Sequence, residues 1–386
     1  MSVFSEFSFI IVRRLMQIFV PKEIQEETRV AITPDTVKKF NSLGIQVNVE
    51  SGIGQLSLST DEAYREAGAN IVAGDQCTRQ LQEADCVLHV LPLACEQLLN
   101  MKEGAWHVSF FDAFRYPQLV ECFQQRKLNV VSLERIPRIS LAQKMDALSS
   151  QSSLAGYVGV LQGIQHLAYV LPMMVTPAGT LQSARVFVIG AGVAGLQAIA
   201  TARRLGARVE AFDTRPEVEE QVNSLGAKFV KINLGATGST AQGYAKALTE
   251  EQLALQRQLM AKTCAKSDIV ITTAKVFGRK APLIINNEII RQMRPGSVIV
   301  DLAVEAGGNT EGLIPGKNFV SDGGVWILGE GYWERKVARS SSQMLSSNLY
   351  AFIEHFWSKE LNALQCDLES SILKSCLYAQ AGTVRF

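Results

Sequence analysis

A glycine-rich turn between a strand pattern and a helix pattern carries the strongest chemical signal in the sequence. The apolar run VFVI ends at Ile189, and the helical run that follows opens with six small residues: Gly190, Ala191, Gly192, Val193, Ala194 and Gly195. The first glycine permits a tight turn, the second lets the backbone approach a pyrophosphate, and the third permits close packing of helix on strand. Since the helix N-terminus then faces the phosphates, the pattern predicts a dinucleotide site.

An acidic residue follows at the spacing where such sites bind the adenosine ribose. The strand-like run RVEAFD ends at Asp213, about twenty residues after the glycine turn. A carboxylate there repels a 2′-phosphate and therefore favours NAD(H) over NADP(H). Arg215 offers a possible phosphate partner, although an ordinary solvated loop charge is the alternative interpretation. We expect NAD(H) to be the cofactor.

A polar loop forms the second candidate site. The segment from Arg138 to Asp146 follows a strand pattern and precedes a long helix, so we expect it in the cleft between two domains. Arg138, Gln143 and Asp146 could form a hydrogen-bonded brace there. Gln143 has both a donor and an acceptor, which suits a nicotinamide carboxamide or a ribose. From the spacing alone, an exposed loop with ordinary polar residues remains the competing interpretation.

Alternating strand and helix patterns position these candidates. Apolar strands that alternate with helices are typical of a parallel sheet covered on both faces. We therefore predict an α/β protein with two doubly wound, Rossmann-like domains and a cleft between them. The expected strands of the first series are 17–20, 45–49, 86–90, 107–111 and 129–133, and those of the second are 185–189, 208–212, 228–232, 269–272, 297–302, 319–320 and 325–328.

Two long helical patterns connect the predicted domains. The apolar, small-residue segment 148–170 predicts a helix between them, and 342–361 returns the chain to the first. We assign residues 16–147 and 340–386 to the first domain and 148–339 to the NAD(H)-binding domain. Residues 362–386 carry no clear motif.

Composition excludes several classes of protein. The net charge of +1 gives no reason to expect a nucleic-acid partner. The seven cysteines are scattered without a CxxC or a Cys/His cluster, so we expect neither a metal site nor a disulfide, and reduced thiols in a cytoplasmic protein instead. No apolar run reaches the ~18–20 residues of a membrane span. We expect the fold to begin near Met16, with residues 1–15 a tail, although a targeting or interaction segment is the alternative.

Several segments resemble one known family. RVAITPDTVKKFNSLGIQV (29–47), PRISLAQKMDALSSQSSLAGY (137–157), GAGVAGLQAIATARRLGA (190–207) and PGSVIVDLAVEAGGN (295–309) are similar to the α subunit of proton-translocating NAD(P) transhydrogenase. The resemblance covers most of the chain, and the 138–152 segment is specific to that family. The wider family includes alanine dehydrogenase. The region around Tyr332 and Trp333 fits less well, since a small polar turn is usual there.

The resemblance implies roles for particular residues. Arg138, Gln143 and Asp146 would organise the nicotinamide, with Ser149 beside it. Gly243 and Tyr244 fall in the GYAK-type end of a mobile loop that senses the nucleotide. Residues 172–184 correspond to a dimerising β-hairpin. Their Met- and Pro-rich, apolar character agrees with burial against a partner.

The resemblance also implies a reaction and partners. A hydride would pass directly from NADH on this chain to NADP⁺ held on a β subunit, and membrane subunits would couple this to proton translocation. Direct transfer needs proximity and orientation but no acid, base or metal. The chain would then be a homodimer in the cytoplasm, peripheral to the inner (plasma) membrane through its partner subunits.

Two other functions compete with this interpretation. An NAD-dependent dehydrogenase of the alanine dehydrogenase type could use Arg29 to bind an oxo acid. However, the segment at Leu91 and Pro92 lacks the lysine of those enzymes, and Asp112 stands where they carry histidine. A non-enzymatic NAD-sensing module is the third possibility.

Overall fold

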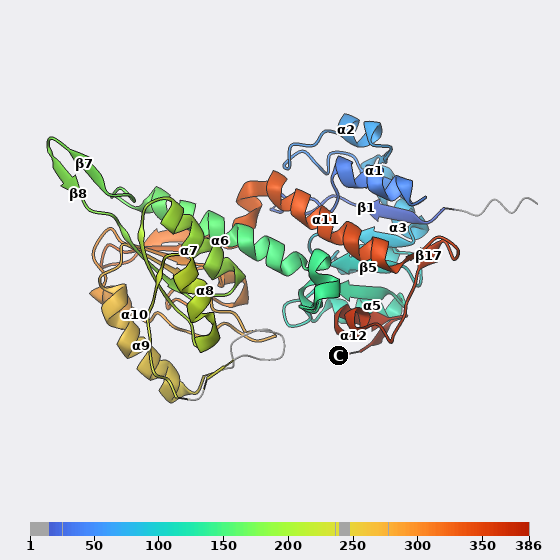
Figure 1. The fold of residues 1–386 in the computed structure, drawn as a ribbon. Coiled ribbons are helices and arrows are strands. Elements are labelled where there is room, and N and C mark those ends of the chain that lie inside the picture. The colour runs from blue at the N-terminus through green and yellow to red at the C-terminus, as the bar shows by residue number, and fades with distance from the viewer. Residues whose placement is uncertain (1–14, 25, 236, 239–247, 277, 386) are drawn as a thin grey trace, which may run out of the picture.

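The computed structural model describes residues 15–24, 26–235, 237, 238, 248–276 and 278–385. Two separate sheets organise the chain, each with helices on both faces (Figure 1). They form two lobes, so the prediction of two doubly wound Rossmann-like units is confirmed.

The first sheet begins with six parallel strands in the order β3-β2-β1-β4-β5-β6. Apart from the edge strand β3, its strands are largely buried on both faces, as a parallel sheet covered by helices requires. The bounds are β1 (Gln17–Val20), β2 (Gln46–Glu50), β3 (Asn70–Val72), β4 (Cys86–Leu88), β5 (Trp106–Ser109) and β6 (Asn129–Ser132). The helices of this lobe before the crossing are α1 (Pro34–Ser42), α2 (Asp61–Glu66), α3 (Cys77–Glu83), α4 (Cys95–Asn100) and α5 (Leu119–Gln125).

The C-terminal segment extends this first sheet. After α12 (Ser371–Cys376), strand β18 (Leu377–Gln380) pairs antiparallel with β6, and β19 (Thr383–Val384) pairs with β18. A short antiparallel pair, β16 (Trp357–Ser358) and β17 (Ala363–Leu364), precedes them. Sequence patterns indicated none of these strands. Such short strands leave too few residues for a recognisable alternation.

The second sheet repeats the arrangement of the first in the order β11-β10-β9-β12-β13-β15-β14, in which only β14 is antiparallel. Its strands are β9 (Arg185–Ile189), β10 (Arg208–Phe212), β11 (Lys228–Phe229), β12 (Ile269–Thr272), β13 (Val298–Asp301), β14 (Lys317–Val320) and β15 (Trp326–Gly329). Helices α7 (Val193–Arg204), α8 (Glu219–Ser224), α9 (Glu250–Cys264) and α10 (Asn287–Gln292) flank it. In this fold ligands bind where the strand order reverses, between β9 and β12.

Helix α6 (Ala147–His166) runs between the two lobes and packs on α7, while α11 (Ala338–Phe356) returns the chain (Figure 1). Three glycines let α6 approach the second lobe closely. A Cβ on Gly156 would lie 2.1 Å from the Ala194 carbonyl oxygen, and Cβ atoms on Gly159 and Gly163 would meet Leu302 and Ile269 at 2.9 and 3.0 Å. The small residues of this segment thus permit close helix packing.

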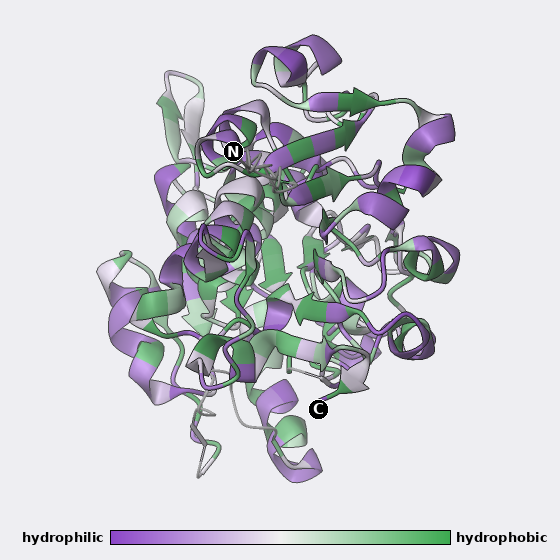
Figure 2. Ribbon diagram, turned by 90° about the vertical axis from the view of Figure 1, so that its right-hand side faces the viewer, coloured by the Kyte–Doolittle hydropathy of each residue, from purple (hydrophilic) through white to green (hydrophobic). Residues whose placement is uncertain are grey.

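Hydrophobic strands occupy the interior and hydrophilic stretches lie on the surrounding helices (Figure 2). Along the described ranges, no helix combines the length and the apolar character of a membrane span. The two-domain boundaries at 147/148 and 339/340 stay a prediction.

Candidate functional site

A cavity of about 440 Å³ lies between the two lobes, lined by residues of both. From the second lobe it receives the glycine turn after β9 and the loops after β10 and β12. From the first lobe it receives the loops after β5 and β6. Among the lining residues are Arg29, Arg138, Gly192, Asp213 and Arg215. The cavity therefore opens at the carboxyl ends of the strands, where doubly wound sheets bind ligands.

The three glycines of the turn lie in different environments. Gly190 has φ +96°, and a Cβ there would lie 2.4 Å from Oγ1 of Thr273. A Cβ on Gly195 would lie 1.9 Å from the Gly190 carbonyl oxygen. By contrast, a Cβ on Gly192 would meet nothing within 4 Å. The protein's own packing thus explains the first and third glycines, whereas Gly192 faces open space at the start of α7.

Asp213 is tied to the glycine turn. Its Oδ2 atom accepts the Ala191 backbone N–H at 2.7 Å, so the end of β10 holds the turn after β9. Arg215 donates from Nε and Nη2 to the two oxygens of the same carboxylate, at 2.9 and 2.8 Å. The Asp213 carboxylate raises the pKa of Arg215, which remains charged.

The polar loop lies beside the cavity as a 3₁₀ helix, η3 (Ser140–Met145). Arg138 is exposed and lines the cavity, whereas Gln143 is exposed and is absent from the lining. Asp146 is the N-cap of α6, where its carboxylate accepts the backbone N–H and the hydroxyl of Ser149. The Asp146–Ser149 pair is therefore formed within the structure, and the wider brace remains a prediction.

A buried cluster of charges at the cavity joins segments far apart in the sequence. Arg29 donates from Nε and Nη2 to the two oxygens of Glu27, each at 2.8 Å. Its Nη1 atom donates to Glu334 at 2.8 Å and to Gln151 at 3.1 Å. Burial alone would lower the pKa of Arg29, but the carboxylates of Glu334 and Glu27 raise it above its usual value. The sequence pattern revealed none of the partners of Arg29.

The sequence patterns also gave no indication of a second group of polar residues at the cavity. Glu134 is half-buried and lines the cavity, and burial raises its pKa to about 8. Tyr332 lines the cavity too; its hydroxyl accepts a hydrogen bond from Arg115, and its φ is +44°. The guanidinium of Arg335 stacks 3.6 Å from the Tyr332 ring centroid. A positive φ is typical of glycine, so the residue type of Tyr332 gives no indication of this backbone conformation.

The histidines of the first sheet are buried and neutral. Burial lowers the pKa of His107 to about 3 and also lowers that of His89. Across the described residues, no three His, Cys, Asp or Glu side chains gather as a metal-binding group. Gly243 and Tyr244 lie outside the described residues.

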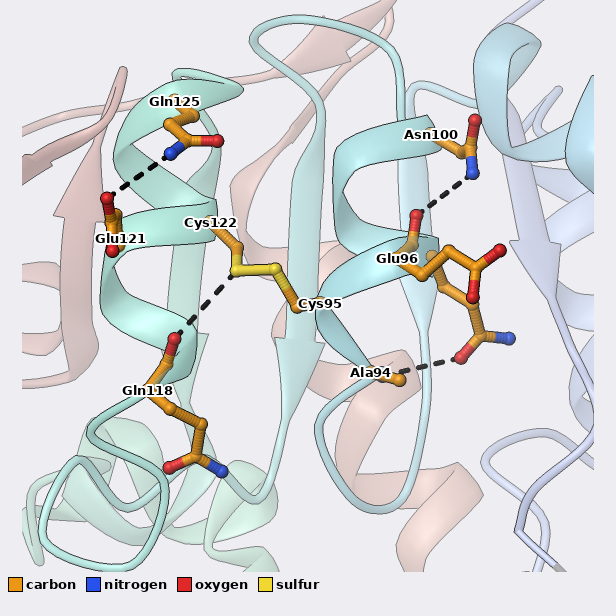
Figure 3. Close-up of a disulfide and its surroundings, with 9 residues drawn as sticks. Ala94, Cys95, Glu96, Asn100, Gln118, Glu121, Cys122 and Gln125 are labelled. Carbon is orange, nitrogen blue, oxygen red and sulfur yellow. Dashed lines mark hydrogen bonds between the residues drawn. A yellow bond between two sulfur atoms is a disulfide. The ribbon is translucent and has the colours of Figure 1, made fainter.

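One expectation about the cysteines is wrong. Cys95 at the start of α4 and Cys122 in α5 form a disulfide, with Cα atoms 5.7 Å apart (Figure 3). The pairing depends on the packing of two helices that are separated by a strand, so spacing alone could not indicate it. Cys77, Cys86, Cys264, Cys366 and Cys376 are free thiols.

Comparisons with known proteins cover nearly the whole chain. Residues 19–155 match the family model described as "Alanine dehydrogenase/PNT, N-terminal domain", and residues 159–386 match "Alanine dehydrogenase/PNT, C-terminal domain". The chain is 43% identical to a Rhodospirillum rubrum protein named as one part of NAD(P) transhydrogenase subunit alpha. The match covers 96% of this chain and 97% of that protein. It is 38% identical to NAD(P) transhydrogenase subunit alpha of Haemophilus influenzae, over 95% of this chain and 71% of the relative.

A solved structure supports the same similarity. Transhydrogenase from Sinorhizobium meliloti superposes with a TM-score of 0.85 and 39% sequence identity, over 96% of this chain and 100% of that one. The two-lobed arrangement is therefore common to both proteins.

Proposed function

Because the chain belongs to the alanine dehydrogenase/PNT family, within its NAD(P) transhydrogenase alpha-subunit branch, we propose that it is the NAD(H)-binding subunit of a proton-translocating NAD(P) transhydrogenase. Its reaction is direct hydride transfer from NADH on this chain to NADP⁺ on a β subunit. Membrane subunits couple that transfer to proton translocation.

The open space at Gly192 is the observation that carries this proposal. A Cβ atom at this position would meet no other part of the protein within 4 Å, yet the residue is glycine and lines the cavity. The space is explained if a ligand fills it. Gly192 is also the N-cap of α7, a twelve-residue helix whose first backbone N–H groups lack partners within the helix. Such amides and the helix dipole favour an anionic group, which suits a pyrophosphate.

The other candidate residues would orient the dinucleotide. Asp213 would bind the adenosine ribose, and Arg138, Gln143, Asp146 and Ser149 would hold the nicotinamide end. When bound, NADH supplies the hydride. The chain's own residues then act by position, since a misplacement of about 1 Å can cost about 100-fold in rate. No acid or base is required for this transfer.

Two observations argue against a reaction of the alanine dehydrogenase type. Binding an oxo acid at Arg29 needs free guanidinium donors, but Glu27 and Glu334 already engage both ends of that side chain. The cavity also has Asp112 where such enzymes carry histidine. A carboxylate there repels an oxo acid.

The exposed hairpin of β7 (Met174–Thr176) and β8 (Gly179–Leu181) supports a proposal about the assembly. Met173, Met174 and Val175 are exposed large apolar side chains on or beside it. We infer a homodimer in which this hairpin contacts the second copy. The dimer would lie in the cytoplasm, peripheral to the inner membrane through the β subunit and the membrane-spanning partners.

Calorimetry tests the cofactor assignment. The wild-type chain should bind NADH with a Kd on the order of micromolar and much more tightly than NADPH, because Asp213 repels the 2′-phosphate. Asp213→Ala should weaken NADH binding. Equal or tighter binding of NADPH by the wild-type chain would contradict the assignment.

A further inference from the structure

Every acceptor position of the Asp213 carboxylate is in use. Oδ1 accepts the backbone N–H of Arg215 at 2.9 Å and its Nε at 2.9 Å. Oδ2 accepts Nη2 of Arg215 at 2.8 Å and the backbone N–H of Ala191 at 2.7 Å. An ionised carboxylate offers about four lone-pair sites, so these four donors saturate it.

The pair is also well shielded from water. The Asp213 side chain is 5% exposed and that of Arg215 is 13% exposed. Bidentate hydrogen bonds between arginine and a carboxylate are among the stronger polar contacts, and more so at low exposure. The side-chain contact with Arg215 is therefore a substantial interaction, and opening it has a free-energy cost.

A ribose diol needs acceptor capacity from the same carboxylate. The Ala191 contact fixes the glycine turn, and the Arg215 backbone contact fixes the loop. Only the two donors from the Arg215 guanidinium can leave without unfolding the site. Two protein donors would then remain and two acceptor positions would become free, which is the number that a diol needs.

We propose that the Arg215 side chain engages the ribose-binding carboxylate of Asp213 in the free protein and must swing away before NAD(H) binds. Arg215 thereby limits NAD(H) affinity and reduces the discrimination against NADP(H). This inference rests on the proposed dinucleotide function. The backbone contact with Asp213 keeps Arg215 next to the ribose position after its side chain has left. A guanidinium there favours a 2′-phosphate, which the Asp213 carboxylate opposes.

The substitution Arg215→Ala should change the affinities for two ligands in opposite directions. Arg215→Ala frees the acceptor positions of Asp213 and should bind ADP-ribose about tenfold more tightly, the equivalent of roughly one charge-assisted hydrogen bond. The same variant loses its cation and should bind 2′-phospho-ADP-ribose about tenfold more weakly. Isothermal titration calorimetry with these two ligands isolates the effect of the 2′-phosphate, since they differ only in that group and neither carries a nicotinamide.

Two further variants keep the test decisive. Arg215→Lys keeps the charge but cannot make the bidentate contact, so its ADP-ribose affinity should lie between those of wild type and Arg215→Ala. Arg208→Ala removes an exposed arginine from the opposite end of β10 and should leave both affinities unchanged. A thermal-unfolding transition like that of wild type confirms that each variant is folded.

The outcomes separate this inference from the proposed function. If wild type binds neither ADP-ribose nor NADH, the proposed function fails. If wild type binds ADP-ribose and folded Arg215→Ala binds it equally or more weakly, Arg215 is an ordinary ligand or a bystander, and the inference alone is overturned. Tighter ADP-ribose binding with weaker 2′-phospho-ADP-ribose binding supports it.

Discussion

The hydroxyl of Ser149 lies 2.6 Å from Oδ2 of Asp146, and the Ser149 backbone N–H donates to Oδ1 of the same carboxylate at 2.8 Å. The candidate nicotinamide loop therefore ends in the N-cap of α6, a twenty-residue helix that contacts both lobes. A loop anchored in this way holds its side chains more rigidly than a free loop does.

Asp146 should have two separable roles. Asp146→Asn keeps a side-chain oxygen for the cap, so its stability should stay within a few tenths of a kcal/mol of wild type, whereas Asp146→Ala should lose about 1 kcal/mol. Both should slow hydride transfer, because the carboxylate is gone. Urea unfolding and single-turnover kinetics measure the two effects. Equal destabilisation by both variants would show that the contact with Ser149 is not a helix cap.

Glu134 should make stability depend on pH. Burial raises its pKa to about 8, well above the ~4.3 of an unfolded glutamate. Between those values the folded chain retains a proton that the unfolded chain has lost, so this group lowers stability as pH rises from about 4.3 to about 8. Glu134→Gln should therefore be more stable than wild type at pH 9 and similar to it at pH 4.

The matched control for this prediction is Glu121→Gln, which removes an exposed carboxylate from α5. Its stability difference from wild type should be small at both pH values. If the stability of Glu134→Gln changed with pH in the same way as that of wild type, Glu134 would have no raised pKa.

Arg29 should be among the most sensitive positions for stability. Its removal leaves the buried Glu27 and the half-buried Glu334 without their main cation, and breaking a buried ion pair from one side typically costs about 3–5 kcal/mol. Arg65→Ala is the control, because its pair with Glu62 is exposed and should contribute only about 0–1 kcal/mol. Similar urea midpoints for Arg29→Ala and Arg65→Ala would contradict a structural role for the buried cluster.

The features that sequence could predict are those encoded locally. The turn at Gly190 and the acid at Asp213 belong to one strand–turn–helix–strand unit, so type and spacing revealed both. Two partners of Arg29 could not be predicted in this way, since Gln151 and Glu334 lie 122 and 305 residues away. The strand β18 depends on an edge that β6 supplies, and its own residues give little signal.

The hairpin of β7 and β8 should hold a dimer together. Met174→Asp places a charge on an apolar surface that the second copy would cover, so light scattering should report monomers. Thr180→Ser, on the paired strand β8, changes little apolar surface and should stay dimeric. Dimers that persist in Met174→Asp would mean that the hairpin is not the dimer contact.

Hydride exchange with a partner tests the central claim most directly. The chain is mixed with the NADP(H)-binding domain of a transhydrogenase β subunit, and transfer from NADH to an NADP⁺ analogue is followed by single-turnover stopped flow. We predict rapid transfer by wild type. Gln143→Ala should slow the transfer by up to about 100-fold while NADH affinity changes little, because the proposed role of Gln143 is to orient the nicotinamide and that of the backbone at Gly192 is to bind the phosphates. A wild-type chain that binds NADH but transfers no hydride to the partner would contradict the account.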